Sequence, residues 1–221
     1  SRRILLAGMT TLATPALAQQ QHPAPQRPAQ RGPAAPATTP AQSPLGPVDT
    51  AARNVVLVDF ETGATLLDKG AEASMPPASM SKLMTMYVVF DMVRKGRLRM
   101  DQMLPVSEAA WRMGGSKMFV GLNETVSVEN LARGVIIQSG NDACVVLAEA
   151  IAGSERAFAD MMNQSAREIG LKDSNFRNAT GWPDPEHRMT CRDLATLAIR
   201  LIQDFPDQFS LYRERSFRWN D

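Results

Sequence analysis

The side chains with the clearest chemical potential lie in the segment Ser79-Met80-Ser81-Lys82. Ser79 and Lys82 are three residues apart, so on a helix they share one face about one turn apart, where hydroxyl and amine can touch. A serine hydroxyl is a weak nucleophile until a base takes its proton, and a lysine can be that base only if its pKa falls from about 10.4 toward neutrality. Burial of the amine lowers the pKa in this way. The segment therefore predicts a serine nucleophile with a lysine base, the chemistry of acyl transfer through a serine ester.

A second segment, Ser139-Gly140-Asn141, offers another hydroxyl and a carboxamide. Apolar residues at helical spacing on both sides predict helices over residues 128–138 and 141–152, which places this segment in a short break between them. Taken alone, Ser-Gly-Asn is an ordinary turn between helices. Next to the Ser79 and Lys82 pair, we interpret Ser139 and Asn141 as further members of one catalytic site.

The element that must hold the nucleophile is a helix over residues 80–93. Pro76 and Pro77 precede this stretch, Gly96 ends it, and it is apolar on most of its faces. Such a helix belongs in the middle of a domain, so a lysine at its start is placed where it should not be charged. The backbone N–H groups at the start of the helix can face a developing oxyanion near Ser79.

The remaining pattern predicts an α/β (α+β) fold in which an antiparallel sheet is packed by helices. Residues 54–60 and 64–67 are β-rich runs around a Gly-containing turn, which indicates a hairpin. Further helices are expected from Ser154 to Gly170 and over residues 193–203, the latter behind a capping box that starts at Thr190. Residues 210–219 alternate aromatic and charged side chains, which is typical of a half-exposed strand.

The N-terminal part indicates export. Residues 1–18 carry two arginines, an apolar run and a small-residue end, which predicts a secretory signal peptide. Residues 19–47 are rich in Pro, Ala and Gln and cannot bury apolar surface, so we expect a disordered linker. The folded catalytic domain is then expected over residues 48–221, in a protein of the periplasm or cell envelope.

Composition excludes several partners. A net charge of +1 with mixed signs gives neither the basic field that nucleic acid requires nor a polybasic cluster for an anionic membrane. The sequence holds no cluster of metal-ligand type, and no cofactor is expected. Cys144 and Cys191 could pair in an oxidising compartment, but their positions in helices favour two small core residues. We interpret His187 as a structural or surface residue.

The two motifs and their surroundings resemble serine-type D-alanyl-D-alanine carboxypeptidases, the low-molecular-mass penicillin-binding proteins of peptidase family S11. The resemblance runs from about Asn54 to the C-terminus. It includes residues 77–85 and 137–143 around the two motifs, and it extends to Gly114-Gly115-Ser116-Lys117-Met118-Phe119, to residues 157–163 and to residues 170–181.

The resemblance implies a serine β-lactamase/transpeptidase-like fold with a helical subdomain, and a role for each site residue. Ser79 would become the acyl-ester and Lys82 would take its proton. Ser139 would relay a proton to the leaving D-alanine, and Asn141 would hold the substrate amide while supporting Lys82. The implied partners are peptidoglycan stem peptides ending in D-Ala-D-Ala, together with β-lactam antibiotics.

The family's third motif, Lys-Thr-Gly on a late strand, does not occur after Asn141. That strand would supply a second oxyanion N–H and a cation for the substrate carboxylate, and loss of one oxyanion donor costs about 10²-fold to 10³-fold in rate. We therefore expect the last sheet strands to lie beyond this chain and the 221 residues alone to be inactive. Membrane contact would come only from a part after Asp221.

Two other functions on the same scaffold stay open at this point. A class A-like β-lactamase uses a Glu acting through water, but no Glu-x-x-x-Asn follows Asn141, where Glu168 is followed four residues later by Lys172. A non-catalytic peptidoglycan-binding protein would keep the scaffold without turnover. A Ser-His-Asp hydrolase is disfavoured because no Gly-x-Ser-x-Gly elbow occurs. Trp182, directly after Gly181, is interpreted as a packing or rim residue.

Overall fold

The structure is a computed structural model and describes residues 40–220. The predicted signal peptide over residues 1–18 and the linker up to residue 39 lie outside the described residues.

A four-stranded antiparallel sheet forms in the order β2-β1-β4-β3. The predicted hairpin is confirmed, with β3 (Val55–Val58) paired to β4 (Thr65–Lys69). The turn between them is held by Asp59, whose Oδ1 accepts from the backbone N and the Oγ1 of Thr62 at 2.7 and 2.6 Å. This is the local bonding expected of an Asx turn, and it explains why the chain reverses here.

The expected end of the linker at residue 47 is wrong. Residues 41–48 form a second hairpin, with β1 (Ala41–Ser43) paired to β2 (Gly46–Val48). Gly46 takes a φ of 111°, a conformation that glycine adopts without strain, and Ser43 Oγ donates to its carbonyl at 2.7 Å. Strand β1 also pairs with β4 through Gln42 and Asp68. The existing sheet edge therefore supplies the hydrogen-bonding partner that a Pro- and Ala-rich composition does not reveal.

The helices carry the rest of the described chain, with one small sheet of β5 and β6 between them. Helices α3 and α4 have the bounds predicted from the sequence, and α5 begins after Ser154 as expected. The elements are η1 (Ala78–Ser81), α1 (Lys82–Arg94), β5 (Met103–Pro105), α2 (Glu108–Arg112), β6 (Thr125–Ser127), α3 (Val128–Gln138), α4 (Asn141–Ala152), α5 (Glu155–Glu168), α6 (Cys191–Asp204) and η2 (Gln208–Arg213).

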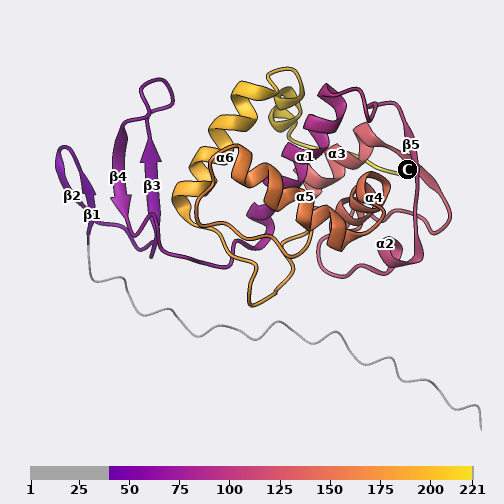
Figure 1. The fold of residues 1–221 in the computed structure, drawn as a ribbon, viewed down its shortest axis with the longest axis horizontal. Coiled ribbons are helices and arrows are strands. Elements are labelled where there is room, and N and C mark those ends of the chain that lie inside the picture. The colour runs from indigo at the N-terminus through magenta and orange to yellow at the C-terminus, as the bar shows by residue number, and fades with distance from the viewer. Residues whose placement is uncertain (1–39, 221) are drawn as a thin grey trace, which may run out of the picture. The chain divides into compact units, whose positions relative to one another are not determined.

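Helix α1 is the centre of the helical part, as its apolar sequence predicts. It packs against α3, α4, α5 and α6, while α6 also contacts β3 and so joins the helices to the sheet (Figure 1). Its buried face and flanks include Met84, Met86 and Phe90, all at most 1% exposed. Its one buried carboxylate, Asp91, is paired with Arg94 and Lys95 at 2.6 Å each. Helix α1, which directly follows η1, is therefore packed on nearly all sides.

Thr190 caps α6 only partly in the way predicted. Its Oγ1 accepts from Asp193 N at 3.0 Å, as in a capping box. The Asp193 carboxylate, however, turns away from the helix start and accepts from the backbone N of Lys172 and Asp173 and from Ser174 Oγ. The acidic residue therefore ties the loop after α5 to α6.

The strand expected over residues 210–219 is wrong. Residues 208–213 form the 3₁₀-helix η2, and no strand includes residues 214–220. Within residues 40–220 no neighbouring strand runs beside this segment, so its alternating pattern has no ladder to join. It docks through side chains instead: Glu214 accepts from Arg133 Nε, and Gln138 Nε2 donates to Phe217 O at 3.2 Å.

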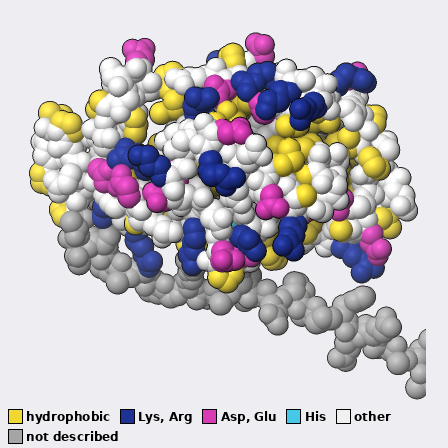
Figure 2. All heavy atoms as spheres, viewed as in Figure 1, with side chains coloured by type: hydrophobic (Ala, Val, Ile, Leu, Met, Phe, Trp, Pro, Cys, Tyr) yellow, Lys and Arg dark blue, Asp and Glu magenta, His cyan; other side chains and the backbone are white. Residues whose placement is uncertain are grey.

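The described residues carry charges of both signs on the surface and several buried methionines in the core. On the face in Figure 2, positive and negative side chains lie interspersed. Cys144 and Cys191 are both free, and Cys144 is fully buried, as predicted for a core residue. Among residues 40–220, no helix combines the length and hydrophobicity needed to cross a bilayer, and no three His, Cys, Asp or Glu side chains lie close enough to hold a metal ion.

Candidate active site

Ser79 lies in the 3₁₀ turn η1, directly before α1, and its side chain is exposed. The turn follows the buried Pro77, and Ala78 has a φ of 50°. A positive φ at a residue with a β-carbon costs free energy and persists only where the surroundings enforce it. Ser81 and Lys82, two and three residues on, are buried. The Ser79 side chain is therefore exposed at η1, while the Lys82 side chain points into the protein.

The Lys82 amine lies between two oxygens. Its Nζ is 2.9 Å from Ser79 Oγ and 2.8 Å from the carbonyl oxygen of Thr180, and the residue is 5% exposed. Burial lowers the pKa of Lys82, and the neighbouring Cys144 thiol acts in the opposite direction. Desolvation disfavours the ammonium form and so favours the neutral amine, which is the form that a general base requires.

Ser139 ends α3 in the left-handed conformation, with a φ of 55°, and Gly140 precedes α4. The predicted break between two helices is therefore present at these residues. A β-carbon on Gly140 would lie 3.2 Å from both Gly134 O and Met118 N, so the chain passes closely here. Ser139 and Ser79, the latter in η1, line the same cavity.

Asn141 begins α4 and is held by residues 114–116. Its Nδ2 donates to Gly114 O and its backbone N to Ser116 O, both at 2.8 Å. The next residue, Asp142, is fully buried and accepts from Met118 N, Val120 N and Ala143 N. These contacts explain why residues 114–119 accompany the second motif in the sequence.

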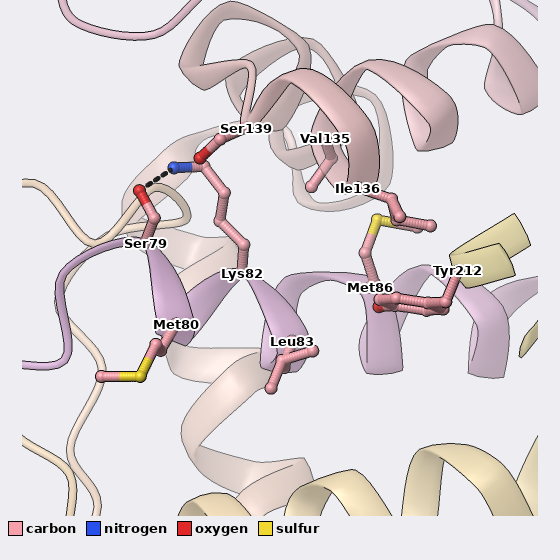
Figure 3. Close-up of a pocket in the computed structure, with 9 residues that line it drawn as sticks. All are labelled: Ser79, Met80, Lys82, Leu83, Met86, Val135, Ile136, Ser139 and Tyr212. Atoms are coloured by element: carbon pink, nitrogen blue, oxygen red, sulfur yellow. Dashed lines mark hydrogen bonds between the residues drawn. The ribbon is translucent and has the colours of Figure 1, made fainter. Parts of the chain in front are cut away.

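A cavity of about 340 Å³ borders Ser79. Figure 3 shows Ser79, Lys82 and Ser139 converging at one end of it, with apolar side chains toward the other end. The apolar lining consists of Met80, Leu83, Met86, Val135, Ile136 and the ring of Tyr212. The structure thus brings three of the four predicted site residues to one cavity.

A second cavity, of about 210 Å³, also borders Ser79 and includes Asn141 in its lining. Its remaining lining consists of Ala78, Gly115, Ser116, Thr180, Gly181, Trp182 and Pro183. Ser79 belongs to both cavities, so a chain that occupied them in turn would pass over the hydroxyl. Trp182, interpreted from the sequence as a packing or rim residue, is 48% exposed and forms part of the wall of this cavity.

The second residue that binds the Lys82 amine, in addition to Ser79, was not predicted from the sequence. Asn141 was expected to support the amine, but its carboxamide donates to Gly114, and the second acceptor of Lys82 is the Thr180 carbonyl. A backbone oxygen carries no sequence signature. The only available signal was Asn178-Ala179-Thr180-Gly181, a composition typical of a side-chain-bonded turn.

His187 belongs to neither cavity and is a structural residue. It is 2% exposed, its Nδ1 accepts from Arg177 N at 3.4 Å, and its ring meets Phe176 edge-on. Burial lowers the pKa of His187 to about 4. The site around Ser79 therefore has a lysine, and not this histidine, as its neighbouring base.

The chain is similar in sequence and in fold to known proteins. A family model described as D-alanyl-D-alanine carboxypeptidase matches residues 37–221. The chain is 38% identical over 177 residues to the D-alanyl-D-alanine carboxypeptidase DacA of Haemophilus influenzae, which covers 79% of this chain and 45% of that protein. The chain thus spans about half the length of the curated relatives that it matches.

Solved structures agree. Penicillin binding protein 5 from Haemophilus influenzae superposes with a TM-score of 0.77 at 38% identity, over 79% of this chain and 52% of that one. Penicillin-Binding Protein D2 from Listeria monocytogenes, in its ampicillin-bound form, gives a TM-score of 0.64 at 28% identity, over 71% of this chain and 63% of that one.

Proposed function

Because the chain belongs to peptidase family S11, the D-alanyl-D-alanine carboxypeptidases, we propose that it carries the nucleophile and base of an enzyme that removes the terminal D-alanine from peptidoglycan stem peptides. The observation that carries this proposal is the buried Lys82 amine, 2.9 Å from the exposed Ser79 hydroxyl and lowered in pKa by its burial.

The reaction would proceed through two steps on Ser79. In the first, Lys82 takes the hydroxyl proton while Ser79 Oγ attacks the carbonyl carbon of the penultimate D-alanine. The peptide C–N bond then breaks, and the leaving D-alanine receives the proton held by Lys82, relayed through the Ser139 hydroxyl. In the second step, water gives a proton to Lys82 and attacks the ester carbonyl carbon. The ester C–O bond breaks, Ser79 Oγ takes this proton from Lys82, and the shortened peptide leaves as a carboxylic acid.

Substrate binding would use both cavities beside Ser79. The Asn141 carboxamide is proposed to hold the substrate amide, which is supported by its place in the wall of the second cavity. A β-lactam mimics the terminal dipeptide and would acylate the same serine. Support for this comes from the ampicillin-bound relative, whose fold the chain shares.

We also propose that the protein acts outside the cytoplasm, in the periplasm or cell envelope. The support is the substrate, which is part of the cell wall, together with the signal-like residues 1–18. A fusion of residues 1–40 to a reporter active only after export tests this part. Reporter activity that does not depend on residues 1–18 would contradict it.

The test of the activity is release of D-alanine from a pentapeptide that ends in D-Ala-D-Ala, with protein produced from the complete gene. We expect release by the wild type and none by Ser79→Ala. Ser210→Ala removes an exposed serine of η2 and serves as the matched control, with unchanged release. Release by the Ser79→Ala variant at the wild-type rate would overturn the proposal. The 221-residue chain, which contains no Lys-Thr-Gly after Asn141, is expected to release little or none.

A further inference from the structure

The carboxamide of Asn178 forms hydrogen bonds throughout the loop of residues 178–182, and this loop packs against η1. Its Oδ1 accepts from the backbone N of Thr180, Gly181 and Trp182 at 3.2, 2.8 and 3.1 Å, and from Thr180 Oγ1 at 3.1 Å. Its Nδ2 donates to Trp182 O at 2.9 Å. One side chain therefore binds the backbone of three residues, Thr180, Gly181 and Trp182, as Asn does in tight turns.

Three successive residues of this loop contact η1 and the start of α1. The carbonyl oxygen of Ala179 accepts from Thr85 Oγ1 at 2.6 Å, and that of Thr180 accepts from Lys82 Nζ at 2.8 Å. Gly181 lies against the carbonyl of Ala78, since a β-carbon at Gly181 would be 1.9 Å from Ala78 O. The loop thus touches the residue before the nucleophile, the base, and the residue one turn beyond the base.

We propose that Asn178 is a positioning residue for the catalytic base, acting through the carbonyl of Thr180. A neutral amine has one lone pair and two N–H bonds. When one N–H is directed at Thr180 O, rotation about the Cε–Nζ bond is restricted, and the lone pair can face the Ser79 hydroxyl. The position of that carbonyl depends on the loop, and the loop depends on Asn178. This inference rests on the proposed function of Lys82 as the base.

The loop also closes the amine off from water. Ala179 and Thr180 are at most 1% exposed, and desolvation is the main cause of the lowered pKa of Lys82. The other titratable groups on this side are Cys144 from α4 and Glu155 from α5, whose carboxylate accepts from Ala179 N at 3.0 Å. Loosening of the loop would let water reach Lys82, so its pKa would rise toward the ordinary value.

The experiment compares Asn178→Ala, which removes the carboxamide, with Asn178→Asp, which keeps an acceptor oxygen. Acylation of Ser79 by penicillin is followed against pH in protein from the complete gene. We expect Asn178→Ala to lower the acylation rate constant by about 10-fold to 100-fold, the usual effect of a misplaced catalytic group, and to move the acid limb to higher pH. Asn178→Asp is expected to recover most of the rate.

Asn163→Ala is the matched control, because the Asn163 carboxamide also holds the incoming part of the loop, through two hydrogen bonds to Phe176. It is expected to lower the melting temperature without moving the pH profile. If Asn178→Ala does not fold, Asn178→Ser, whose hydroxyl can replace part of the acceptor, takes its place. An unchanged rate and acid limb in the Asn178 variant would overturn the proposal, as would an equal shift in Asn163→Ala.

A second readout separates this inference from the function itself. The chain has five lysines, so the pKa of Lys82 can be followed by NMR with lysine labelled at Cε. A raised pKa of Lys82 in Asn178→Ala, without penicillin, supports the positioning role, and an unchanged pKa contradicts it. If the wild type is never acylated while the NMR shift is present, the proposed function fails but the link between Asn178 and Lys82 stands.

Discussion

Gly181 lies against Ala78 so closely that a β-carbon at position 181 would be 1.9 Å from the Ala78 carbonyl oxygen and 2.8 Å from Ser81 Oγ. Both residues adjoin members of the proposed site: Ala78 precedes Ser79, and Gly181 follows Thr180, whose carbonyl binds Lys82. This contact couples the position of η1 to that of the loop of residues 178–182.

Gly181→Ala should therefore displace η1, which contains Ser79. The new methyl group meets backbone atoms, which cannot move aside as a flexible side chain can, and overpacking of this kind costs about 1–3 kcal/mol. Gly153→Ala is the control, because Gly153 has the same φ of 78° but no atom within 4 Å of its β-carbon. Urea denaturation should show a larger loss of unfolding free energy for Gly181→Ala. Equal losses would mean that the contact with Ala78 is not the constraint.

Lys82→Met should abolish base catalysis while the helix stays folded. Loss of a general base lowers rates by about 10²-fold to 10⁴-fold, so acylation of Ser79 should fall by that amount. In the wild type the rate should fall on the acid side as the amine gains a proton, with an apparent pKa below the ordinary lysine value because burial lowers the pKa of Lys82. Lys172→Met, at an exposed lysine, should retain both rate and profile. A Lys82→Met variant with the wild-type profile would exclude the amine as base.

His187 should make stability depend on pH. Its pKa is about 4 in the folded chain and 6.5 without burial, so the unfolded state binds more protons between these values. Its contribution is therefore complete above pH 6.5 and is lost as pH falls toward 4, by about 3 kcal/mol in all. His187→Gln cannot take up a proton, and its unfolding free energy should vary less over this range. An identical slope in both proteins would contradict the buried neutral imidazole.

Asp142→Ala should detach residues 118–120 from the start of α4. The change leaves the N–H groups of Met118 and Val120 without their acceptor, and a buried donor without a partner costs about 1–3 kcal/mol. Asp142→Asn keeps one acceptor oxygen and should lose less. Thermal unfolding measures both, and the cavity lining at Gly115 and Ser116 should become more accessible to proteolysis in the Ala variant. Equal stability of the Ala variant and the wild type would contradict this role.

The local elements could be predicted from the sequence, and the long-range pairings could not. Helices α3 and α4 begin and end where the apolar spacing over residues 128–138 and 141–152 indicates, since this signal lies within each helix. The tail over residues 210–219 has an equally regular pattern, but a strand needs a neighbour, and pattern alone does not supply one. For residues 41–48 the error is the reverse: the sequence predicts a linker up to residue 47, but β4 provides a strand with which β1 pairs.

The same limit applies to the site. Ser79 and Lys82 could be paired from their spacing, because three residues on a helix fix their separation. The Thr180 carbonyl lies 98 residues from Lys82 along the chain, and only the folded structure brings it to the amine. The roles proposed for Ser139 and Asn141 stay predictions, and their positions beside the two cavities are what the structure adds.

Ser79 is the residue that we propose is acylated, and mass spectrometry after incubation with penicillin can identify the modified residue. Protein from the complete gene should gain the mass of one penicillin, and peptide mapping should place the adduct on Ser79. The Ser79→Ala variant should gain none, and the adduct should leave slowly rather than turn over as in a β-lactamase. An adduct on another residue, or one that persists in Ser79→Ala, would contradict the account.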